Sequence, residues 1–441
     1  MSARIIPAKL VHARVTSSYV RHDPVTVKPR GVEFQSLPSF YVKRPIIVFE
    51  RTPIKPVNPA KAELKPLTIK PNETESSQAY KPKKKLALLL PGHNEELIIA
   101  TTIRSAMAAG QNKRDIFVVN DASTDETRQI ATELLGQQNV LTVQRSGKAL
   151  AVQKAVKKFN IERDYQWLHV ADADSVFSPD YFRIYRKKLS KDYVVAIGFV
   201  QSLRGNWISN YRAFSYTYGQ HFYRRIQSSL GMISVFPGPV TSFRTDILSQ
   251  LDINGRNVTE DFDMTLQVHR KKLGKILYIP KAVNYTQDPQ SFHDFCKQSM
   301  RWYRGFFQGI REYRIGLGRQ RIDVGIGFQL VQTVLLLVQV LVLFPFILIK
   351  THHWMAIPIA ISIDFILTGV LTIISAVVIK RWTLLGVLPY FYFLRMAEVV
   401  MYFTAFAEIM VLGHSTSGIK GWGTEGRRYK IDSVALQDVV A

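Results

Sequence analysis

Residues 86–96 read LALLLPGHNEE, a run of five apolar residues and then a polar loop that opens with Pro91 and Gly92. A short apolar run without alternation is typical of a parallel strand that is buried on both faces. The chain then predicts a helix over 96–109, a strand over 115–120 and a helix that ends near residue 135. A strand over 140–144, a helix over 148–159 and a strand over 167–170 follow. Strands that alternate with helices indicate a right-handed parallel α/β sheet.

Four short polar motifs accompany these elements. They are VVND at 118–121, ADAD at 171–174, TED at 259–261 and QSMRW at 298–302. In open α/β sheets, ligands bind at the carboxyl ends of the strands, where the motifs at 118–121 and 171–174 are expected to lie. The sequence therefore predicts a binding site at this edge of the sheet.

The ADAD motif places Asp172 and Asp174 on either side of one small residue at a strand end. Carboxylate oxygens suit Mg²⁺ or Mn²⁺, and a nucleotide diphosphate would supply further oxygen ligands. The ion would offset the charge that develops on a leaving diphosphate. We predict that Asp174 and Asp172 hold the metal and that Asp172 also contacts the substrate. Two solvated loop acids are the alternative.

Other candidates for substrate binding lie in the same half of the chain. Asp121 is expected to accept a hydrogen bond from a nucleobase or a ribose, with an N-cap of the following helix as the alternative. Lys148, at the start of a predicted helix, is either a phosphate ligand or a surface lysine. Asn94 and Glu95, in the loop after the first strand, complete this group.

The TED motif supplies the candidate general base, Asp261. A carboxylate at such a site can take the proton of an acceptor hydroxyl as this hydroxyl attacks an electrophilic carbon. Glu260 is assigned to substrate binding, and Asp263 is the competitor for the role of base. Thr259 is also a candidate cap of the helix that starts here.

Aromatic and basic residues are concentrated over 292–314, and the apolar ones share one helical face. This pattern predicts a helix in the membrane interface, with an ordinary amphipathic core helix as the alternative. Gln298, Arg301 and Trp302 stand at i, i+3 and i+4 and are expected to project from one side. Arginine can pair with a diphosphate and tryptophan can stack on a sugar ring. A second such stretch, 207–225, is a candidate lining for an acceptor groove or lies on the membrane.

The chain is strongly basic, with 58 Lys and Arg against 34 Asp and Glu, a net charge of +24. Such charge suits a nucleic acid, but it also suits a surface held against anionic lipid. The apolar C-terminal third favours the lipid, so we expect no nucleic acid partner. Residues 1–84 are basic and contain many prolines, which predicts an extended or disordered arm. The single Cys296 excludes an intramolecular disulfide.

The C-terminal third predicts two to three transmembrane or interfacial helices within 323–412. Residues 324–349 carry no formal charge, and a spanning helix needs about 20 apolar residues. A second span is expected over 354–379 and a third apolar stretch over 382–412. The third stretch contains Arg395, Glu398 and Glu408, which should face protein or a polar channel because charge in a bilayer is costly. Residues 1–30 lack an apolar signal core, so we expect these helices to direct membrane insertion.

In these motifs the chain resembles the processive, membrane-integrated family 2 glycosyltransferases, which include hyaluronan, cellulose, chitin and poly-N-acetylglucosamine synthases. The resemblance covers about residues 86–428. It implies a GT-A type nucleotide-sugar-binding domain over 85–290, with a Rossmann-like, mostly parallel sheet. Interfacial helices over 291–322 and C-terminal transmembrane helices would follow this domain. By the same resemblance Asp121 would bind the base of UDP. The pair Asp172 and Asp174 would bind metal and UDP-sugar, and Asp261 would be the base.

The resemblance extends to the tail. Residues 422–427, WGTEGR, look like the Trp-Gly-Thr-x-x-Arg gating loop of hyaluronan synthases, which implies that Trp422, Thr424 and Arg427 contact UDP from the cytoplasmic side. Residues 413–441 would then be a cytoplasmic loop and tail, with a basic solvated tail as the alternative. Many relatives have transmembrane helices ahead of the catalytic domain, whereas this chain has a basic arm. A partner subunit, a homo-oligomer or transfer without export would each account for the small number of spans.

The sequence thus predicts a multi-pass cell-membrane enzyme with a cytoplasmic catalytic domain. It would be an inverting β-glycosyltransferase that uses a UDP-sugar, of N-acetylglucosamine or glucose type, and Mg²⁺ or Mn²⁺. The acceptor would be a growing polysaccharide, and the alternative is a single addition to a lipid-linked acceptor. A membrane-anchored nucleic-acid-binding protein and an inactive homologue are the rival classes, and the four retained acids count against both.

Overall fold

The computed structural model describes residues 14–18, 44–48, 84–253, 257–315, 319–338, 342–351, 355–414 and 429–431. The chain divides into two units, Met1–Ala79 and Tyr80–Ala441. In the first unit, β1 (Arg14–Ser18) and β2 (Arg44–Val48) pair in antiparallel register. The remainder of the predicted basic arm lies outside the described residues.

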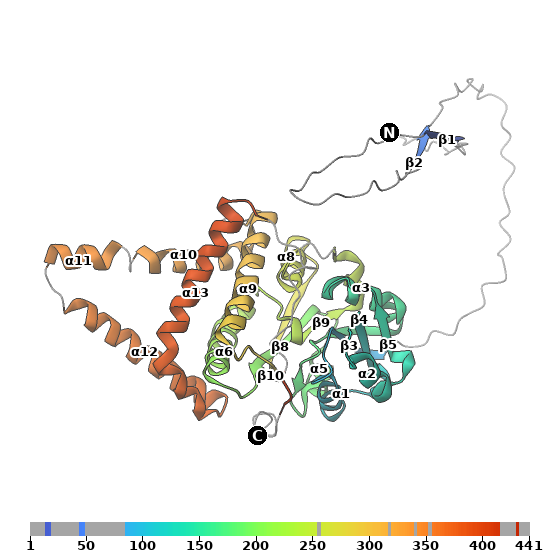
Figure 1. The fold of residues 1–441 in the computed structure, drawn as a ribbon, viewed down its shortest axis with the longest axis horizontal. Coiled ribbons are helices and arrows are strands. Elements are labelled where there is room, and N and C mark those ends of the chain that lie inside the picture. Colours follow the sequence, from blue (N-terminus) through green and yellow to red (C-terminus); the bar gives the residue numbers. More distant parts are fainter. Residues whose placement is uncertain are drawn as a thin grey trace, which may run out of the picture. The chain divides into compact units, whose positions relative to one another are not determined.

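The second unit is built on a sheet of eight described strands, in the order β5-β4-β3-β6-β9-β8-β10-β7 (Figure 1). Their bounds are β3 Lys84–Gly92, β4 Ile116–Asp121, β5 Val140–Val143, β6 Tyr165–Val170, β7 Val176–Phe177, β8 Tyr193–Ser202, β9 Thr241–Arg244 and β10 Lys275–Thr286. The predicted order of alternating strands and helices is confirmed over residues 84–170. The fold is the expected GT-A type α/β arrangement.

The sheet is mixed rather than uniformly parallel. Strands β5, β4, β3 and β6 run parallel, and so do β8 and β10. Strand β9 is antiparallel to both β6 and β8, and β7 is antiparallel to β10. The prediction of a mostly parallel sheet is confirmed, but it did not include β9 and β7. These strands have four and two residues, too few for a periodic signal.

The apolar run that opens the domain is buried on both faces of the sheet. Leu86, Leu88 and Leu90 contribute to one core cluster, and Ala87 and Leu89 contribute to the other. All five are at most 2% exposed. Burial of a leucine side chain stabilises the fold by about 1.5–3 kcal/mol, so this strand is a large part of the core. A strand with two covered faces has no need of polar alternation, which explains the continuous run.

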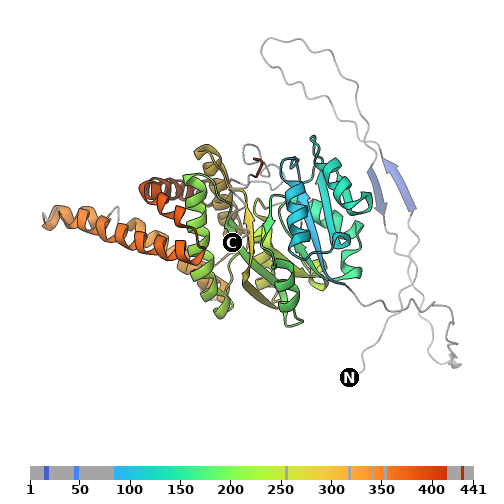
Figure 2. The ribbon, with the colours of Figure 1, turned by 90° about the horizontal axis from the view of Figure 1, so that it is seen from below.

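Helices cover both faces of this sheet (Figure 2). Side chains of α1, α2 and α5 line the first cluster, and side chains of α3 and α4 line the second. The bounds are α1 Ile99–Ala108, α2 Thr127–Leu135, α3 Lys148–Lys158, α4 Ile161–Asp164, α5 Tyr181–Lys188, α6 Trp207–Thr217, α7 Arg224–Leu230, α8 Glu260–Arg270 and α9 Phe292–Glu312.

The C-terminal helices gather beyond α6 and α9, on the side of α9 away from β3–β5 (Figure 1). They are α10 Arg321–Val338, α11 Phe344–Thr351, α12 Ala356–Val378 and α13 Phe391–Phe406, with a 3-10 segment η7 at Trp382–Tyr390 and a π-helical segment η8 at Ala407–Val411.

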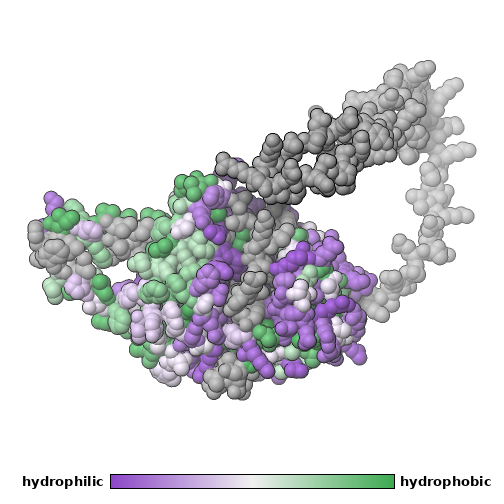
Figure 3. Space-filling model, viewed as in Figure 1, coloured by the Kyte–Doolittle hydropathy of each residue, from purple (hydrophilic) through white to green (hydrophobic). Residues whose placement is uncertain are grey.

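Among the described helices, Pro358–Val378 and Trp382–Val411 are long and apolar enough to cross a membrane. Helices α10 and α11 cover much of the predicted first span, whose middle falls outside the described residues. Figure 3 shows apolar surface over this helical part and polar surface over the sheet domain.

Charged residues of the third apolar stretch pair with other side chains. Glu398 contacts Arg212 of α6 at 3.1 Å, and Glu408 contacts Arg304 of α9 at 2.6 Å. Both acids therefore face protein, as predicted. Arg395 pairs with an aspartate of α12 at 3.2 Å and stays 37% exposed.

Two glycines allow α9 to approach the start of α8. A Cβ built on Gly305 would overlap the side chain of Thr259, and one on Gly309 would lie 2.6 Å from Phe262 Cε1. Each of these Cβ atoms would be nearer to its neighbour than any ordinary contact between non-bonded heavy atoms. The glycines at i and i+4 thus set the spacing between the helix that carries Asp261 and the helix that carries the QSMRW motif.

Candidate active site

Lys148 joins two of the sequence motifs at the carboxyl edge of the sheet. Its Nζ lies 2.5 Å from Asp172 Oδ1 and 3.3 Å from Glu260 Oε1. Burial works to lower the pKa of Lys148, but the two carboxylates outweigh it and raise this pKa above its usual value. The lysine therefore stays charged between the ADAD and TED motifs. A Cβ at Gly238 would lie 2.7 Å from the same Nζ, so the loop before β9 leaves room for the ammonium group.

Asp261 has the properties of a general base. Burial and the neighbouring Glu260 raise its pKa to about 6, while Lys148, the backbone N–H of Phe262 and Arg301 act in the opposite direction. The Phe262 N–H donates to Asp261 Oδ1 at 2.8 Å. A base works best when its pKa lies near the working pH. At neutral pH Asp261 is therefore mostly ionised and still basic enough to take a proton.

Asp263, the competing acid, is held in the protein interior. It is 7% exposed and accepts hydrogen bonds from the Tyr313 hydroxyl and from Gln267 Nε2. Its carboxylate connects α8 to the residue that follows α9. The arrangement favours Asp261 over Asp263 as the base.

Thr259 stands at the N-cap position of α8, but within the described chain its side chain makes no capping hydrogen bond. The prediction of a threonine cap is therefore wrong. The methyl and hydroxyl groups pack against Gly305 of α9 instead. Packing against the neighbouring helix has taken precedence over local capping.

Asp121 fixes the loop that leads to Lys148. Its fully buried carboxylate accepts hydrogen bonds from the backbone N–H of Ser146 at 2.8 Å and of Gly147 at 2.9 Å, and lies 3.2 Å from Arg145 Nη1. Helix α2 begins only at Thr127, so Asp121 is not its N-cap. Contact between Asp121 and a nucleobase stays a prediction.

Asn94 and Glu95 brace the loop after β4. Asn94 Oδ1 accepts from the backbone N–H of Thr124 at 2.9 Å, and its own N–H donates to Ser123 Oγ at 3.0 Å. The N–H of Glu95 donates to Thr127 Oγ1 at 2.7 Å. These contacts hold two loops together at the carboxyl edge. A direct role in substrate binding remains a prediction.

The ADAD carboxylates differ in their surroundings. The side chain of Asp172 is 31% exposed and is drawn toward Lys148, whereas Asp174 is 1% exposed and lies near Thr286 Oγ1, 3.4 Å away. Across the described ranges no group of three or more His, Cys, Asp or Glu side chains has the arrangement of a metal site. Two carboxylates alone fit an ion that takes its remaining ligands from a substrate diphosphate.

The QSMRW residues do not all face the same surroundings. Gln298 is 6% exposed, whereas Trp302 is partly exposed and stacks against the guanidinium of Arg212, 4.6 Å from its ring centre. Arg301 is close enough to lower the pKa of Asp261. The motif thus reaches the base on one side and α6 on the other.

The apolar face of α9 forms a protein core. Phe295 and Ser299 are at most 1% exposed and Ile310 is 6% exposed, and they pack against α6, α8 and α13. At these residues other helices of the protein cover the face, and a place of α9 in the membrane interface stays a prediction. The sequence pattern of an amphipathic helix is the same whether lipid or protein covers the apolar face.

The tail returns to the site. Trp422, Thr424 and Arg427 lie outside the described residues, but Gln287 Nε2 donates to the backbone oxygen of Tyr429 at 2.5 Å. Burial raises the pKa of the Tyr429 hydroxyl, and Asp288 and Asp174 add to the effect. Tyr429 therefore lies near the second ADAD carboxylate, a position that no sequence motif indicates.

Arg224 is a second residue that the motifs missed. It is 8% exposed, and its Nε and Nη1 have no hydrogen-bond partner among the described residues. Burial lowers its pKa to about 10, against the opposing effect of Tyr278 and Asp261. Arg224 lies within 207–225, the stretch predicted to line an acceptor groove or to lie on the membrane. Its place in this stretch is the sequence signal that could have indicated Arg224.

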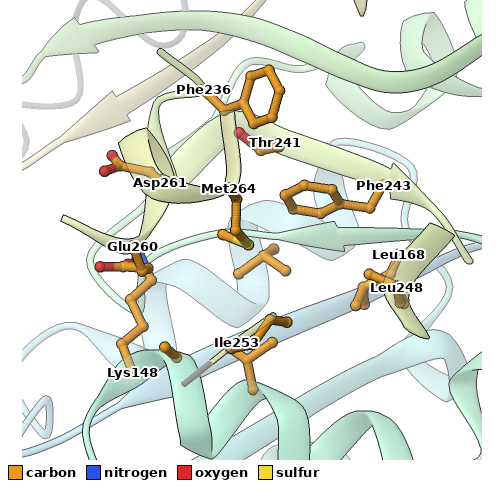
Figure 4. Close-up of a pocket in the computed structure, with 14 residues that line it drawn as sticks. Lys148, Leu168, Phe236, Thr241, Phe243, Leu248, Ile253, Glu260, Asp261 and Met264 are labelled. Atoms are coloured by element: carbon orange, nitrogen blue, oxygen red, sulfur yellow. The ribbon is translucent and has the colours of Figure 1, made fainter. Parts of the chain in front are cut away.

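An apolar pocket adjoins the charged cluster (Figure 4). Lys148, Glu260 and Asp261 form one side of it, while Leu168, Phe243 and other apolar residues of the sheet and of α8 form the rest. In Figure 4 both carboxylates point away from these apolar side chains. The pocket thus combines a polar rim with an apolar floor.

This fold and this cluster of acids define a nucleotide-sugar enzyme of the GT-A class. A family model described as "Glycosyltransferase like family 2" matches residues 82–305, just over half of the chain. The chain therefore belongs to this family and is a glycosyltransferase.

Relatives among characterised proteins include poly-beta-1,6-N-acetyl-D-glucosamine synthases. The one from Staphylococcus epidermidis is 24% identical over 229 residues, which is 50% of this chain and 54% of that protein. The one from Staphylococcus aureus (strain COL) is 22% identical over 227 residues, with the same coverage. The chain thus matches about half the length of these relatives.

Solved structures with a related fold are more distant. A mannosyltransferase from Pyrobaculum calidifontis, in complex with GDP-Man and Mn²⁺, is 15% identical with a TM-score of 0.44, covering 73% of this chain and 88% of that one. Glucosyl-3-phosphoglycerate synthase from Mycobacterium tuberculosis, in complex with Mg²⁺ and UDP, is 14% identical with a TM-score of 0.37, covering 51% and 79%.

Proposed function

We propose that this protein is a membrane-bound, inverting β-glycosyltransferase that extends a polysaccharide from a UDP-sugar. The observation that carries the proposal is Asp261, a carboxylate with a pKa of about 6 beside the Lys148–Asp172–Glu260 cluster. N-acetylglucosamine is the first donor to test, because the staphylococcal relatives are named as synthases of its β-1,6 polymer. The two apolar helices support a place at the membrane. A sheet domain on the cytoplasmic side is part of the proposal.

The proposed chemistry is a single displacement. Asp261 takes the proton of an acceptor hydroxyl while this oxygen bonds to the anomeric carbon, and the bond from that carbon to the diphosphate oxygen breaks. The two events occur on opposite faces of the sugar, so the anomeric configuration inverts. Lys148 and Arg301 supply positive charge beside the base and the ADAD acids.

A divalent ion fits the site in the presence of the donor. Asp174 and Asp172 would hold Mg²⁺ or Mn²⁺ together with the diphosphate oxygens. When bound, the ion stabilises the negative charge of the leaving UDP. Lys148 would then share Asp172 with the ion. When no donor is present, the ion pair between Lys148 and Asp172 would keep this carboxylate oriented.

The test is UDP release by the full chain in nanodiscs, with a panel of UDP-sugars and Mg²⁺ or Mn²⁺, followed by sizing of the product. Turnover of one donor into a long polymer would support the proposal and identify the sugar. A single-sugar adduct on an added lipid acceptor would show that the enzyme is not processive.

Asp261→Asn is the decisive variant. It should abolish transfer and leave UDP binding largely intact, because it removes a base and no proposed metal ligand. Asp180→Asn, at a side chain that is 60% exposed and outside the site, is the matched control and should retain wild-type turnover. Near-normal turnover of Asp261→Asn would place the base elsewhere.

A further inference from the structure

Arg212 of α6 is a buried cation held between two aromatic rings of α9. It is 3% exposed, and its guanidinium carbon lies 4.4 Å from the ring centre of Phe295 and 4.6 Å from that of Trp302. Its Nη2 donates to Ser299 Oγ at 2.6 Å. Three side chains on successive turns of α9 therefore meet one arginine.

The same guanidinium reaches the C-terminal apolar stretch. Arg212 Nη1 donates to Glu398 Oε1 of α13 at 3.1 Å, and the Tyr211 hydroxyl donates to Glu398 Oε2 at 2.7 Å. Glu398 lies within Trp382–Val411, one of the two helices suited to cross a membrane. The ion pair of the buried Arg212 with Glu398, whose side chain is 21% exposed, thus joins α6 to α13, and the contacts of Arg212 with α9 connect the three helices.

Packing alone does not require a charge at this position. Removing a guanidinium and a carboxylate from water carries a desolvation penalty, and a well-packed apolar replacement is often at least as stable. The Nε of Arg212 also has no hydrogen-bond partner among the described residues. The charge is therefore poorly explained by stability and better explained by the orientation that it imposes on its neighbours.

Arginine can impose this orientation because its planar guanidinium stacks on an aromatic face and directs hydrogen bonds within its own plane. Stacked on Trp302 and bonded to Glu398 and Ser299, it fixes the indole relative to both α9 and α13. Trp302 remains partly exposed, so part of its ring is accessible to a ligand. Asp261 is linked to the same helix through Arg301 and through the close packing at Gly305.

We propose that Arg212, with Glu398, is a positioning pair that holds Trp302 as a platform for the acceptor sugar and connects this platform to helix α13. The proposal rests on the proposed function, because it assigns the acceptor side of that site. It predicts that a change at Glu398, in an apolar helix, alters acceptor binding through Arg212.

The experiment compares Arg212→Met, Arg212→Lys and Glu398→Gln in nanodiscs, with Arg183→Met, at an arginine of α5 whose side chain is 68% exposed, as the matched control. Acceptor KM and UDP affinity are measured for each. Arg212→Met should raise the acceptor KM roughly tenfold or more, as expected for a lost desolvated cation–π contact, with UDP affinity essentially unchanged. Arg212→Lys should recover part of the loss, and Glu398→Gln, which keeps the volume and the bond from Tyr211, should show a smaller rise.

A second measurement does not depend on transfer. The emission of Trp302 is isolated by subtracting the spectrum of each variant that also carries Trp302→Phe, and its quenching by acrylamide is measured. Arg212→Met and Glu398→Gln should both increase this quenching, whereas Arg183→Met should not. If the wild-type protein releases no UDP, the proposed function fails, and the quenching still decides whether Arg212 orders Trp302.

Two results would overturn the proposal. One is Arg212→Met with wild-type acceptor KM and wild-type quenching of Trp302. The other is an equal loss of UDP affinity, acceptor affinity and thermal stability in both Arg212→Met and Glu398→Gln, which would mark the pair as a general support of the fold.

Discussion

Gly305→Ala is expected to disturb the site through a single methyl group. The new Cβ would overlap Thr259, and even the Cβ of that threonine would be only 2.8 Å away. An ordinary carbon–carbon contact is about 3.5–4.0 Å, so α9 must move by roughly 1 Å relative to the start of α8. Because Asp261 is in the first turn of α8 and Trp302 is in α9, the two would separate.

The effects on stability and on activity should differ in size. Overpacking costs about 1–3 kcal/mol, and the replacement of glycine by alanine within a helix returns about 1 kcal/mol. The net loss of unfolding free energy is therefore small, at about 0–2 kcal/mol. A displacement of 1 Å between reacting groups can lower turnover by roughly 100-fold.

The assay is UDP release at saturating donor and acceptor, together with a thermal melt of the same sample. Gly369→Ala in α12 is the matched control, because a Cβ there would meet nothing within 4 Å, and it should keep full activity. Gly305→Ala with wild-type turnover would refute the argument that the contact between α8 and α9 sets the geometry of the site. A loss of turnover matched by an equal loss of folded protein would also count against it.

Three further predictions follow from the charges. In a pH–rate profile, turnover should fall as the pH drops through about 6, where Asp261 becomes protonated. Lys148→Met should move this acidic limb of the profile to higher pH, because it removes a cation that lowers the pKa of Asp261. An unmoved limb would contradict the coupling between Lys148 and Asp261. Asp174→Ala should weaken Mg²⁺-dependent UDP binding in calorimetry, and unchanged binding would argue against its role as a metal ligand. Asp323 is fully buried, and its carboxylate accepts two hydrogen bonds from the guanidinium of Arg270. Asp323→Ala removes this partner and should lower the unfolding free energy by about 3 kcal/mol in a denaturation experiment. Wild-type stability of the variant would show that this pair contributes little.

The first half of the sheet could be predicted because its signals are local. The run at 86–90 is continuous since both faces of β3 are covered, and each following strand is separated from the next by a helix of eight or more residues. Lys148 was a candidate from its place at a helix start, and the structure brings it to Asp172 and Glu260. The contact with Asp172 follows from the order of the parallel strands, whereas Glu260 comes from α8, which strand order does not place.

The residues that sequence reasoning missed depend on partners that are distant in the chain. Arg212 looks like one of many surface cations until α13 brings Glu398, 186 positions later, against it. Tyr429 is near Asp174 only because the tail returns to the end of β10. Thr259 is a residue type that often caps helices, but its side chain packs against Gly305 of the neighbouring helix instead. Tertiary packing decided each of these, and a single sequence does not encode it in any local pattern.

The place of β9 in the sheet has a consequence for biosynthesis. This strand lies between β6 and β8, but the ribosome makes β8 first and β9 only after residues 203–240. Until residues 241–244 leave the exit tunnel, the edges of β6 and β8 that β9 will join have no native partner, and exposed strand edges invite association between nascent chains. The sheet closes in the interval before the first apolar helix is synthesised. Rapid translation over 203–244, or a chaperone that covers these edges until β9 emerges, would therefore protect the chain while β6 and β8 lack their shared neighbour.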